Sequence, residues 1–212
     1  MNLRAPIGLI ATSPLIILVN QSVPARNVQE LIALAKAQPG KLNYASAGPG
    51  SGIHLGTVLF AETAGIDLTH IPYKGTGPAL TDLLGGHVQI YFSSLPPAIG
   101  LVKEGKLRAL GVTGLKRSSS FPDLPAVAEQ GLPGFEAVLH YGIVAPAGTP
   151  RPIVDRLNAA LRAALDDPKV RGQIAAEGAE PLSTSPEDYA ADIDLEENKW
   201  SALVRKSNAQ GK

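Results

Sequence analysis

Apolar and polar positions along the first half of the chain follow the periods of short strands and helices. Continuous apolar runs of strand length alternate with stretches that repeat apolar residues three and four positions apart, and Gly or Pro separates them. The runs that predict strands are 15–19, 41–47, 70–73, 88–92 and 107–112. Strands alternating with helices are typical of a parallel sheet flanked by helices, so the pattern predicts an α/β fold here.

The second half of the chain has a different pattern. A Pro-, Ser- and Gly-rich stretch at 116–134 predicts an irregular connection, and a strand-like run at 138–145 precedes three amphipathic helical patterns. These few elements do not complete a sheet, so we expect their apolar stripes to need a partner surface. The stripe of the last helix consists of Tyr189, Ile193, Trp200 and Val204.

Composition removes several classes of function. The 212 residues carry 19 Lys+Arg and 19 Asp+Glu, a net charge of +0, which disfavours nucleic acids and anionic membranes as partners. There is no Cys, which excludes disulfides, thiolate nucleophiles and zinc ribbons. Arg4 before apolar residues imitates a secretory signal, but Pro6 and Pro14 interrupt the run, and 15–19 fits a buried parallel strand better.

Small and polar residues follow three successive predicted strands. Carboxyl ends of parallel strands meet at one edge of a sheet, where ligands of α/β proteins bind. The first loop is glycine-rich and leads into a helix, whose free N–H groups at 51–54 would favour a carboxylate or phosphate. A plain tight turn and a solvated Lys74 remain open as alternatives. The candidate ligand-binding residues are Gly48, Gly50, Ser51, Gly52 and His54, then Tyr73, Lys74 and Gly75, and finally Ser93 and Ser94.

Catalytic and cofactor motifs are incomplete. Gly48 and Gly50 match the start of a dinucleotide fingerprint, but Ile53 stands in place of its third Gly. The segment 100–107 resembles a phosphate-binding loop, yet Leu107 replaces the hydroxyl that would bind magnesium. The four histidines lack metal-ligand spacing, and no nucleophile, base and orienting group are apparent. The sequence therefore gives no support for an enzyme, and it predicts neither a metal nor a cofactor.

Six ordered motifs run through most of the chain: 41–48 (KLNYASAG), 70–75 (HIPYKG), 78–86 (PALTDLLGG), 105–110 (GKLRAL), 121–125 (FPDLP) and 145–150 (APAGTP). Together they resemble the substrate-binding receptors of tripartite tricarboxylate transporters, the Bug or TctC family. The resemblance implies a bacterial periplasmic receptor with a periplasmic-binding-protein-like fold of two α/β lobes. It also implies a small carboxylate ligand that is passed to membrane transporter subunits.

The resemblance further implies a domain organisation. Residues 13–115 would be the second, ligand-binding lobe, 116–134 a connection, and 135–212 the returning part of the first lobe. The N-terminal third of the family has no counterpart in this sequence, so we expect an incomplete first lobe. The family's ligand loop usually reads GNGTSSHL, whereas Gly52 and Ile53 replace two hydroxyls here, and Ser93-Ser94 replaces an acidic or amide pair. Fewer donors indicate a weaker or more apolar ligand, or lost binding.

Two interpretations follow. The first is a periplasmic solute-binding receptor, or a truncated form of one, for a small carboxylate. The alternative is a cytoplasmic, non-transport derivative of the same fold, such as a small enzyme or a lobe-exchanged assembly. Localisation separates them, because a receptor must be exported. In either case the unpartnered stripes of the tail predict a homodimer through the C-terminal helices.

Overall fold

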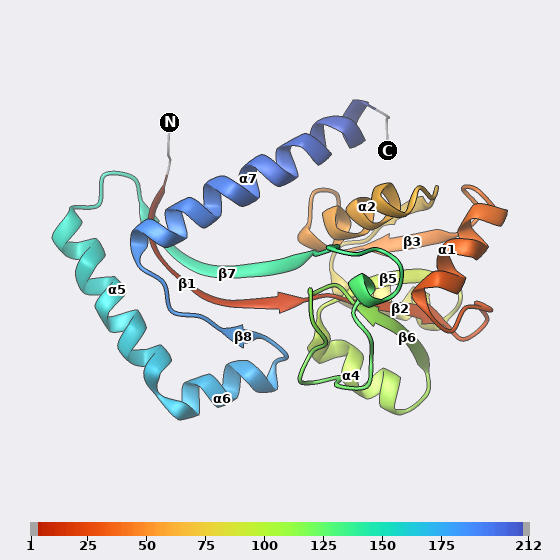
Figure 1. Cartoon of the computed structure of the whole chain (residues 1–212), viewed down its shortest axis with the longest axis horizontal. Helices are drawn as coiled ribbons and strands as arrows, with labels where there is room; N and C mark the ends of the chain where they lie inside the picture. Colours follow the sequence, from red (N-terminus) through yellow and green to blue (C-terminus); the bar gives the residue numbers. More distant parts are fainter. Residues whose placement is uncertain (1–3, 210–212) are drawn as a thin grey trace. The chain divides into compact units, whose positions relative to one another are not determined.

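A computed structural model describes residues 4–209 of the chain, with side chains to Arg205 (Figure 1). The fold is α/β, and the chain divides into two compact units. The larger unit combines Pro14–Val138 with the segment from Leu203 onward. The smaller unit combines the segment up to Ser13 with Leu139–Ala202. Within the described residues, no helix is both long and apolar enough to span a bilayer.

The larger unit is built on a five-stranded sheet with the order β4-β3-β5-β2-β6. β3 pairs in parallel with β4 and with β5, whereas β2 pairs antiparallel with both β5 and β6. The sheet is therefore mixed, and the prediction of a parallel strand at 15–19 is wrong in direction. The strands are β2 (Ile16–Asn20), β3 (Asn43–Ser46), β4 (Thr69–Pro72), β5 (Ile90–Ser93) and β6 (Leu107–Val112).

The direction of β2 follows from where the chain enters the sheet. The Leu15 N–H donates to Thr113 Oγ1 at 2.7 Å, and the Thr113 N–H donates to the Leu15 carbonyl at 2.9 Å. Thr113 comes directly after β6, so β2 begins at the edge where β6 ends and must run the opposite way. An apolar run carries no information on direction, because parallel and antiparallel strands bury the same residue types.

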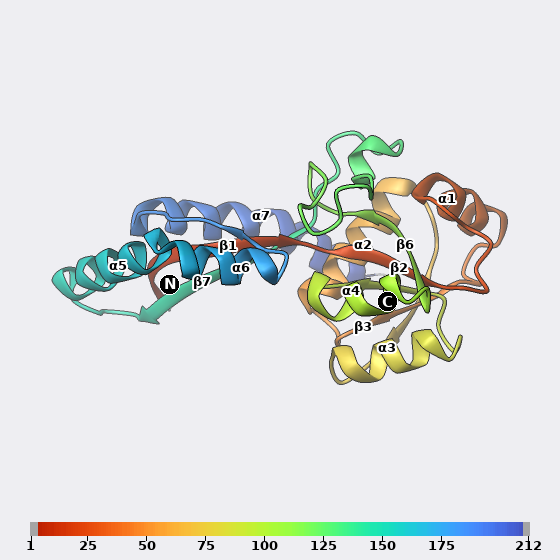
Figure 2. The ribbon, with the colours of Figure 1, turned by 90° about the horizontal axis from the view of Figure 1, so that it is seen from below.

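Helices cover both faces of this sheet (Figure 2). Phe60 of α2 packs on Phe92 of β5 with ring centroids 5.4 Å apart, while the Tyr91 hydroxyl donates to Thr76 of α3 at 3.2 Å. Phe92 and Tyr91 are neighbours on a strand and point to opposite faces, so α2 and α3 lie on opposite sides. The helices of this unit are α1 (Val28–Ala37), α2 (Gly52–Ala64), α3 (Thr76–Leu84) and α4 (Leu95–Lys103).

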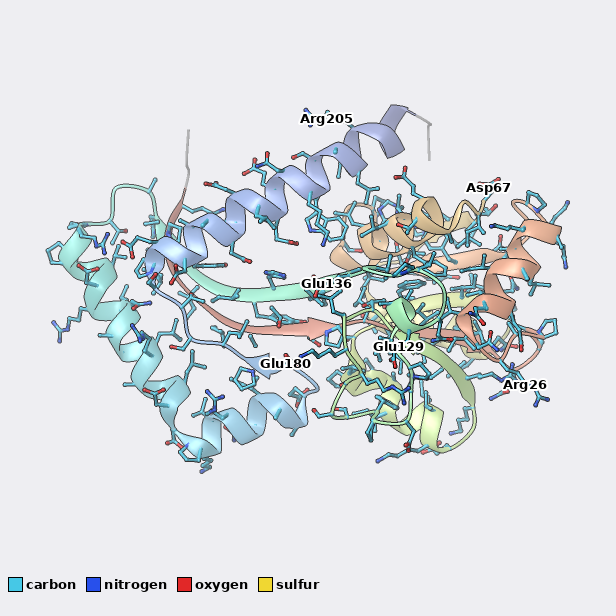
Figure 3. All side chains as sticks on the ribbon, in the orientation of Figure 1. Arg26, Asp67, Glu129, Glu136, Glu180 and Arg205 are labelled. Carbon is cyan, nitrogen blue, oxygen red and sulfur yellow. The ribbon has the colours of Figure 1, made fainter. Side chains whose placement is uncertain are left out.

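The 116–134 connection is held to the larger unit by polar side chains. Gln130 accepts from the Val28 N–H at 2.9 Å and donates to the Leu110 carbonyl at 3.0 Å. Glu129, labelled in Figure 3, lies in the 3₁₀ turn η1 (Val127–Glu129) and pairs with Arg117 at 3.1 Å. The connection therefore adopts one defined path although it contains little regular structure.

The smaller unit contains a three-stranded sheet with the order β7-β1-β8. The sequence pattern did not predict β1, although Ile7, Leu9 and Ala11 are buried with the period of a strand. Two prolines interrupt the apolar pattern of this strand. Pro6 lies near the start of β1, and Pro14 is its last residue. The elements are β1 (Arg4–Pro14), β7 (Val138–Pro146), β8 (Glu180–Pro181), α5 (Arg151–Asp166), α6 (Pro168–Ala176) and α7 (Pro186–Ala209), the last of which continues into the larger unit.

Candidate functional site

The carboxyl ends of β4, β3 and β5 are neighbours, and α3, α2 and α4 begin from them. All ten predicted site residues lie in or beside the three loops at this edge of the larger unit. The first two loops touch, because the Tyr73 N–H donates to the Ser46 carbonyl at 3.1 Å. A Cβ atom on Gly48 would lie 3.5 Å from the Tyr73 carbonyl oxygen. The edge therefore gathers the starts of three helices.

The glycine loop after β3 is shaped by two residues in the left-handed region. Gly48 has φ 125° and Gly50 has φ 75°, values that favour glycine. Ser51 caps α2, and its Oγ accepts from the His54 N–H at 3.2 Å. The Ser51 N–H itself donates to the Gly48 carbonyl at 3.2 Å. Of the four amides expected to be free, two are thus already bonded.

The amides of Gly52 and Ile53 remain open in the described part of the chain, because the first residues of a helix have no intrahelical acceptor. Gly52 is exposed and nothing lies within 4 Å of a Cβ placed on Gly50. A ligand can therefore approach this helix start closely. Two adjacent N–H donors at the positive end of a helix suit one carboxylate group.

The histidine of this loop lies below the surface. His54 is buried, and its Nδ1 accepts from the Gly50 N–H at 3.2 Å. Its ring stacks on His70 of β4 with centroids 4.2 Å apart, and the His70 ring stacks on Tyr44 of β3 at 4.9 Å. Burial lowers the pKa of His54, and burial with the charge of His54 lowers the pKa of His70 to about 4.

The sequence pattern did not identify His70 or Tyr44 as part of this site. Both are close to the glycine loop only because β3 and β4 pair in parallel with Tyr44 opposite His70. Ser46, which ends β3, lies 2.7 Å from the His70 Nε2 through its Oγ. The available signal was the alternation along β3, which places Tyr44 and Ser46 on one face.

The second loop presents another open helix start. Gly75, with φ 108°, precedes α3, and no side chain caps this helix. The Tyr73 hydroxyl donates to Asp82 Oδ2 at 2.6 Å, and burial together with the Asp82 carboxylate raises the pKa of Tyr73 to about 12. Tyr73 therefore fixes the loop to α3. Lys74 is exposed and is the one formally charged residue among the ten candidates.

The third loop contributes less. Ser93 is fully buried, and within the described residues its Oγ has no hydrogen-bond partner. Ser94 precedes α4 without a capping bond from its side chain. Pro96 and Pro97 carry no N–H, so Leu95 supplies the first amide that α4 can offer. Ser93 thus lies beneath the edge, and its side chain is not accessible to a ligand in this conformation.

The chemistry available at this edge is that of hydrogen-bond donors and helix dipoles. Within residues 4–209 no group of three or more His, Asp or Glu side chains is placed to hold a metal ion. His54 and His70 use their ring nitrogens toward Gly50 and Ser46. The arrangement can hold an anionic group by its backbone amides.

Comparison with known proteins gives a consistent family and fold. The family model for the tripartite tricarboxylate transporter family receptor, TctC, matches residues 2–209. Protein BugT of Bordetella pertussis is 36% identical over 205 residues, which cover 97% of this chain and 63% of BugT. The chain spans about 60% of the length of the first curated relatives that it matches.

Solved structures match the fold closely. Rpa4515 of R. palustris with adipate has a TM-score of 0.87 and 35% identity, over 97% of this chain and 69% of that one. MatC of Rhodopseudomonas palustris with bound malate has a TM-score of 0.84 and 32% identity, over 95% of this chain and 69% of that one. The predicted α/β fold is confirmed, with a mixed sheet in place of a parallel one.

Proposed function

Because this chain belongs to the TctC, or Bug, family of tripartite tricarboxylate transporter receptors, we propose that its larger unit binds a small carboxylate at the carboxyl edge of β3, β4 and β5. The family is one of solute-binding receptors and not of enzymes. We assign ligand binding to the 13–115 lobe, with 116–134 as its connection and 135–212 as the returning part of the first lobe. In this assignment the receptor acts in the periplasm and passes its ligand to the membrane subunits of the transporter.

The observation that carries this proposal is the pair of open amides at Gly52 and Ile53. They lie at the start of a 13-residue helix, beside Gly50, where an added Cβ atom would meet nothing within 4 Å. Gly52 is exposed, whereas Ile53 is 8% exposed. The second helix start, at Gly75, is uncapped and adjacent. Two neighbouring helix starts suit a ligand with two carboxylate groups, which agrees with adipate in Rpa4515 and malate in MatC.

Recognition by backbone amides does not depend on the hydroxyl side chains that Gly52 and Ile53 replace. Gly52 and Ile53 offer N–H groups whatever their side chains are. Exposed Lys74 adds attraction at long range, which raises the rate of association more than the affinity. We therefore expect small dicarboxylates to be preferred over neutral analogues of the same length.

The test uses one amide that can be removed without disturbing the helix. Gly52 is the first residue of α2, a position that proline favours, and Ser51 already has the extended backbone (φ −64°, ψ 153°) that must precede proline. Gly52→Pro removes the N–H, and Gly52→Ala keeps it. In calorimetric titrations with adipate and malate, we expect Gly52→Pro to weaken binding about tenfold or more, as for a hydrogen bond to a charged group. Equal affinities of the Pro and Ala variants would place the ligand elsewhere.

The C-terminal helices support a second part of the proposal, a homodimer. The stripe of α7 was expected to need a partner surface, but the chain itself largely covers it, since Tyr189 is buried against β7 and Trp200 is half-buried. Leu195 of the same helix is 65% exposed, and Ile153 and Leu157 of α5 are 50% and 45% exposed. Apolar side chains of this size favour association when they are left in water.

Sedimentation velocity at micromolar concentration tests the dimer. We expect a dimer that dissociates when Leu157 and Leu195 are both replaced by Ser. A monomeric chain would contradict the dimer, and a dimer that persists in the double variant would place the interface on another surface.

A further inference from the structure

Two histidine rings lie directly beneath the glycine loop, and each is linked to one of its glycine amides. His54 Nδ1 accepts from the Gly50 N–H at 3.2 Å. Ser46 Oγ accepts from the Gly48 N–H at 3.1 Å and lies 2.7 Å from the His70 Nε2. One ring thus holds one end of the loop directly, and the other holds the opposite end through a serine.

The rings are fixed by three different elements. His54 comes from the first turn of α2, His70 from β4 and Tyr44 from β3. The two histidine rings stack with an interplanar angle of 27°, and Tyr44 and His70 stack at 18°. Tyr44 and His70 are also direct partners in the parallel register. Because Tyr44 and His70 are paired in the sheet, the stack can serve as a rigid support for the glycine loop, which lies outside the sheet.

The hydrogen bonds define the state of the rings. A backbone N–H can only donate, so the Nδ1 of His54 must be unprotonated for Gly50 to be held. Ser46 Oγ accepts from Gly48 and keeps one hydroxyl hydrogen, which the Nε2 of a neutral His70 can accept. Burial favours the neutral form of both rings, in agreement with these bonds.

We propose that His54 and His70 are positioning residues of the carboxylate site, which hold the glycine loop in the shape that leaves the Gly52 and Ile53 amides open. This inference rests on the function proposed above. Gly48 and Gly50 can each adopt many backbone conformations, so an untethered loop would lose entropy when a ligand ordered it. With the two tethers, the loop loses this conformational entropy when the chain folds and not when the ligand binds.

The test compares variants that keep or remove each acceptor. Asn places an oxygen where His has Nδ1, and Gln places one near the position of Nε2, whereas Leu removes both. We therefore compare His54→Asn with His54→Leu, and His70→Gln with His70→Leu. Amide hydrogen exchange of Gly50 and Gly48 in the ligand-free chain reports on the tethers, and calorimetry with adipate reports on the site.

We expect the His54→Leu variant to exchange the Gly50 amide about tenfold faster and to bind adipate about tenfold more weakly, the effect of one net hydrogen bond. The His54→Asn variant should stay near the wild type in both measurements. A merely structural role of the ring would make Asn and Leu equally harmful, since neither restores the stacking. Equal behaviour of the two variants, or a Gly50 amide that stays protected in His54→Leu, would overturn the proposal.

The two proposals fail in different ways. If the wild-type chain binds neither adipate nor malate, and Gly50 exchange still separates Leu from Asn, the tether is supported and the carboxylate function fails. If the wild type binds and all variants bind equally, the carboxylate function stands and the positioning role is overturned. If His54→Leu does not fold, the comparison of His70→Leu with His70→Gln decides. The positioning role then predicts faster exchange of the Gly48 amide in His70→Leu than in His70→Gln.

Discussion

In the larger unit the interior strand β2 lies between β5 and β6, and its residues Ile16, Ile17, Leu18 and Val19 are all 0% exposed. In the smaller unit the nine-residue strand β7 leaves four consecutive residues, 141–144, exposed. Both segments contain aliphatic side chains, since Ile143 and Val144 of β7 are as apolar as the residues of β2. The difference lies in the sheets. β2 is an interior strand of a five-stranded sheet with helices on both faces, whereas β7 is an edge strand of a three-stranded sheet.

Polar side chains also link the elements of the smaller unit. Asn158 of α5 is buried and donates to the carbonyls of Ile7 at 2.7 Å and Thr184 at 2.9 Å. His140 of β7 bonds to Asp192 of α7 at 2.9 Å. The amphipathic patterns in this part of the sequence correctly predicted the helices of the smaller unit. An apolar stripe on such a helix becomes part of a core only where another surface covers it.

The largest expected effect contrasts one apolar residue from each unit. Phe92→Ala in β5 removes a fully buried ring that packs on Phe60, and should lower the free energy of unfolding by about 3–5 kcal/mol. Leu157→Ala in α5 removes a side chain that is exposed in the single chain. At a protein concentration low enough to keep the chain monomeric, it should change the free energy of unfolding by no more than about 0.5 kcal/mol. Urea denaturation measures both variants. At the micromolar concentrations at which the proposed dimer forms, the loss in Leu157→Ala should be larger, because the dimer covers this side chain; an equally large loss in the monomer would contradict the exposure of Leu157.

A tightly packed position also exists in the smaller unit. A Cβ atom on Gly142 of β7 would collide with the ring of Tyr189 of α7. Gly142→Ala should therefore cost about 1–3 kcal/mol. Gly172→Ala in the exposed interior of α6 meets nothing within 4 Å and should instead stabilise by about 0.5–1 kcal/mol. Thermal denaturation of the two variants distinguishes packing from backbone effects; similar shifts in both would contradict the placement of Tyr189.

Strain at the glycine loop should give an intermediate effect in the larger unit. Gly50 has φ 75° and open space above it, so Gly50→Ala adds backbone strain without a collision and should cost about 1–2 kcal/mol. Gly100→Ala in α4 also enters open space, but at a helical position, and should stabilise the chain slightly. Denaturant midpoints of the two variants should move in opposite directions. Movement in the same direction would mean that the loop does not hold the left-handed conformation.

The last expected effect is a dependence on pH that belongs to the larger unit. Burial and the neighbouring His54 lower the pKa of His70 from 6.5 to about 4 in the folded chain, so between these values the unfolded chain binds more protons. Its contribution to stability is complete above pH 6.5 and is lost as the pH falls toward 4. His70→Gln lacks this contribution, so its urea midpoint should fall less than that of the wild type over this range. If the urea midpoints of the wild type and of His70→Gln depended on pH in the same way, the pKa of His70 would not be lowered in the folded chain.

Features that depend on near neighbours in the sequence could be predicted. The spacing of Asn27 and Glu30 is typical of a capping box at the start of α1, and the Asn27 side chain accepts from the Glu30 N–H at 2.8 Å. The glycine loop was found in the same way, because Gly48, Gly50 and Ser51 define a turn and a helix start by themselves. The hydrogen bonds of such caps and turns join residues only a few positions apart, so their spacing in the sequence predicts them.

Features that depend on strand register could not be predicted. The direction of β2 is set by pairing with residues about 75 to 95 positions away, such as Ile16 with Ser93 and Val112. The same pairing buries the Ser93 hydroxyl, which the sequence pattern had assigned to the edge. The support of the glycine loop by His70 likewise follows from the β3–β4 register.

The central claim is that a small carboxylate binds at the start of α2 in the larger unit, and an NMR titration that resolves single amides tests it most directly. With adipate added to the chain, we expect the amide resonances of Gly52 and Ile53 to shift most and to saturate, with smaller shifts at Thr76 and Gly77. Saturable shifts centred on α5, α6 or the first turns of α7, or no saturable shift in a folded chain, would contradict it.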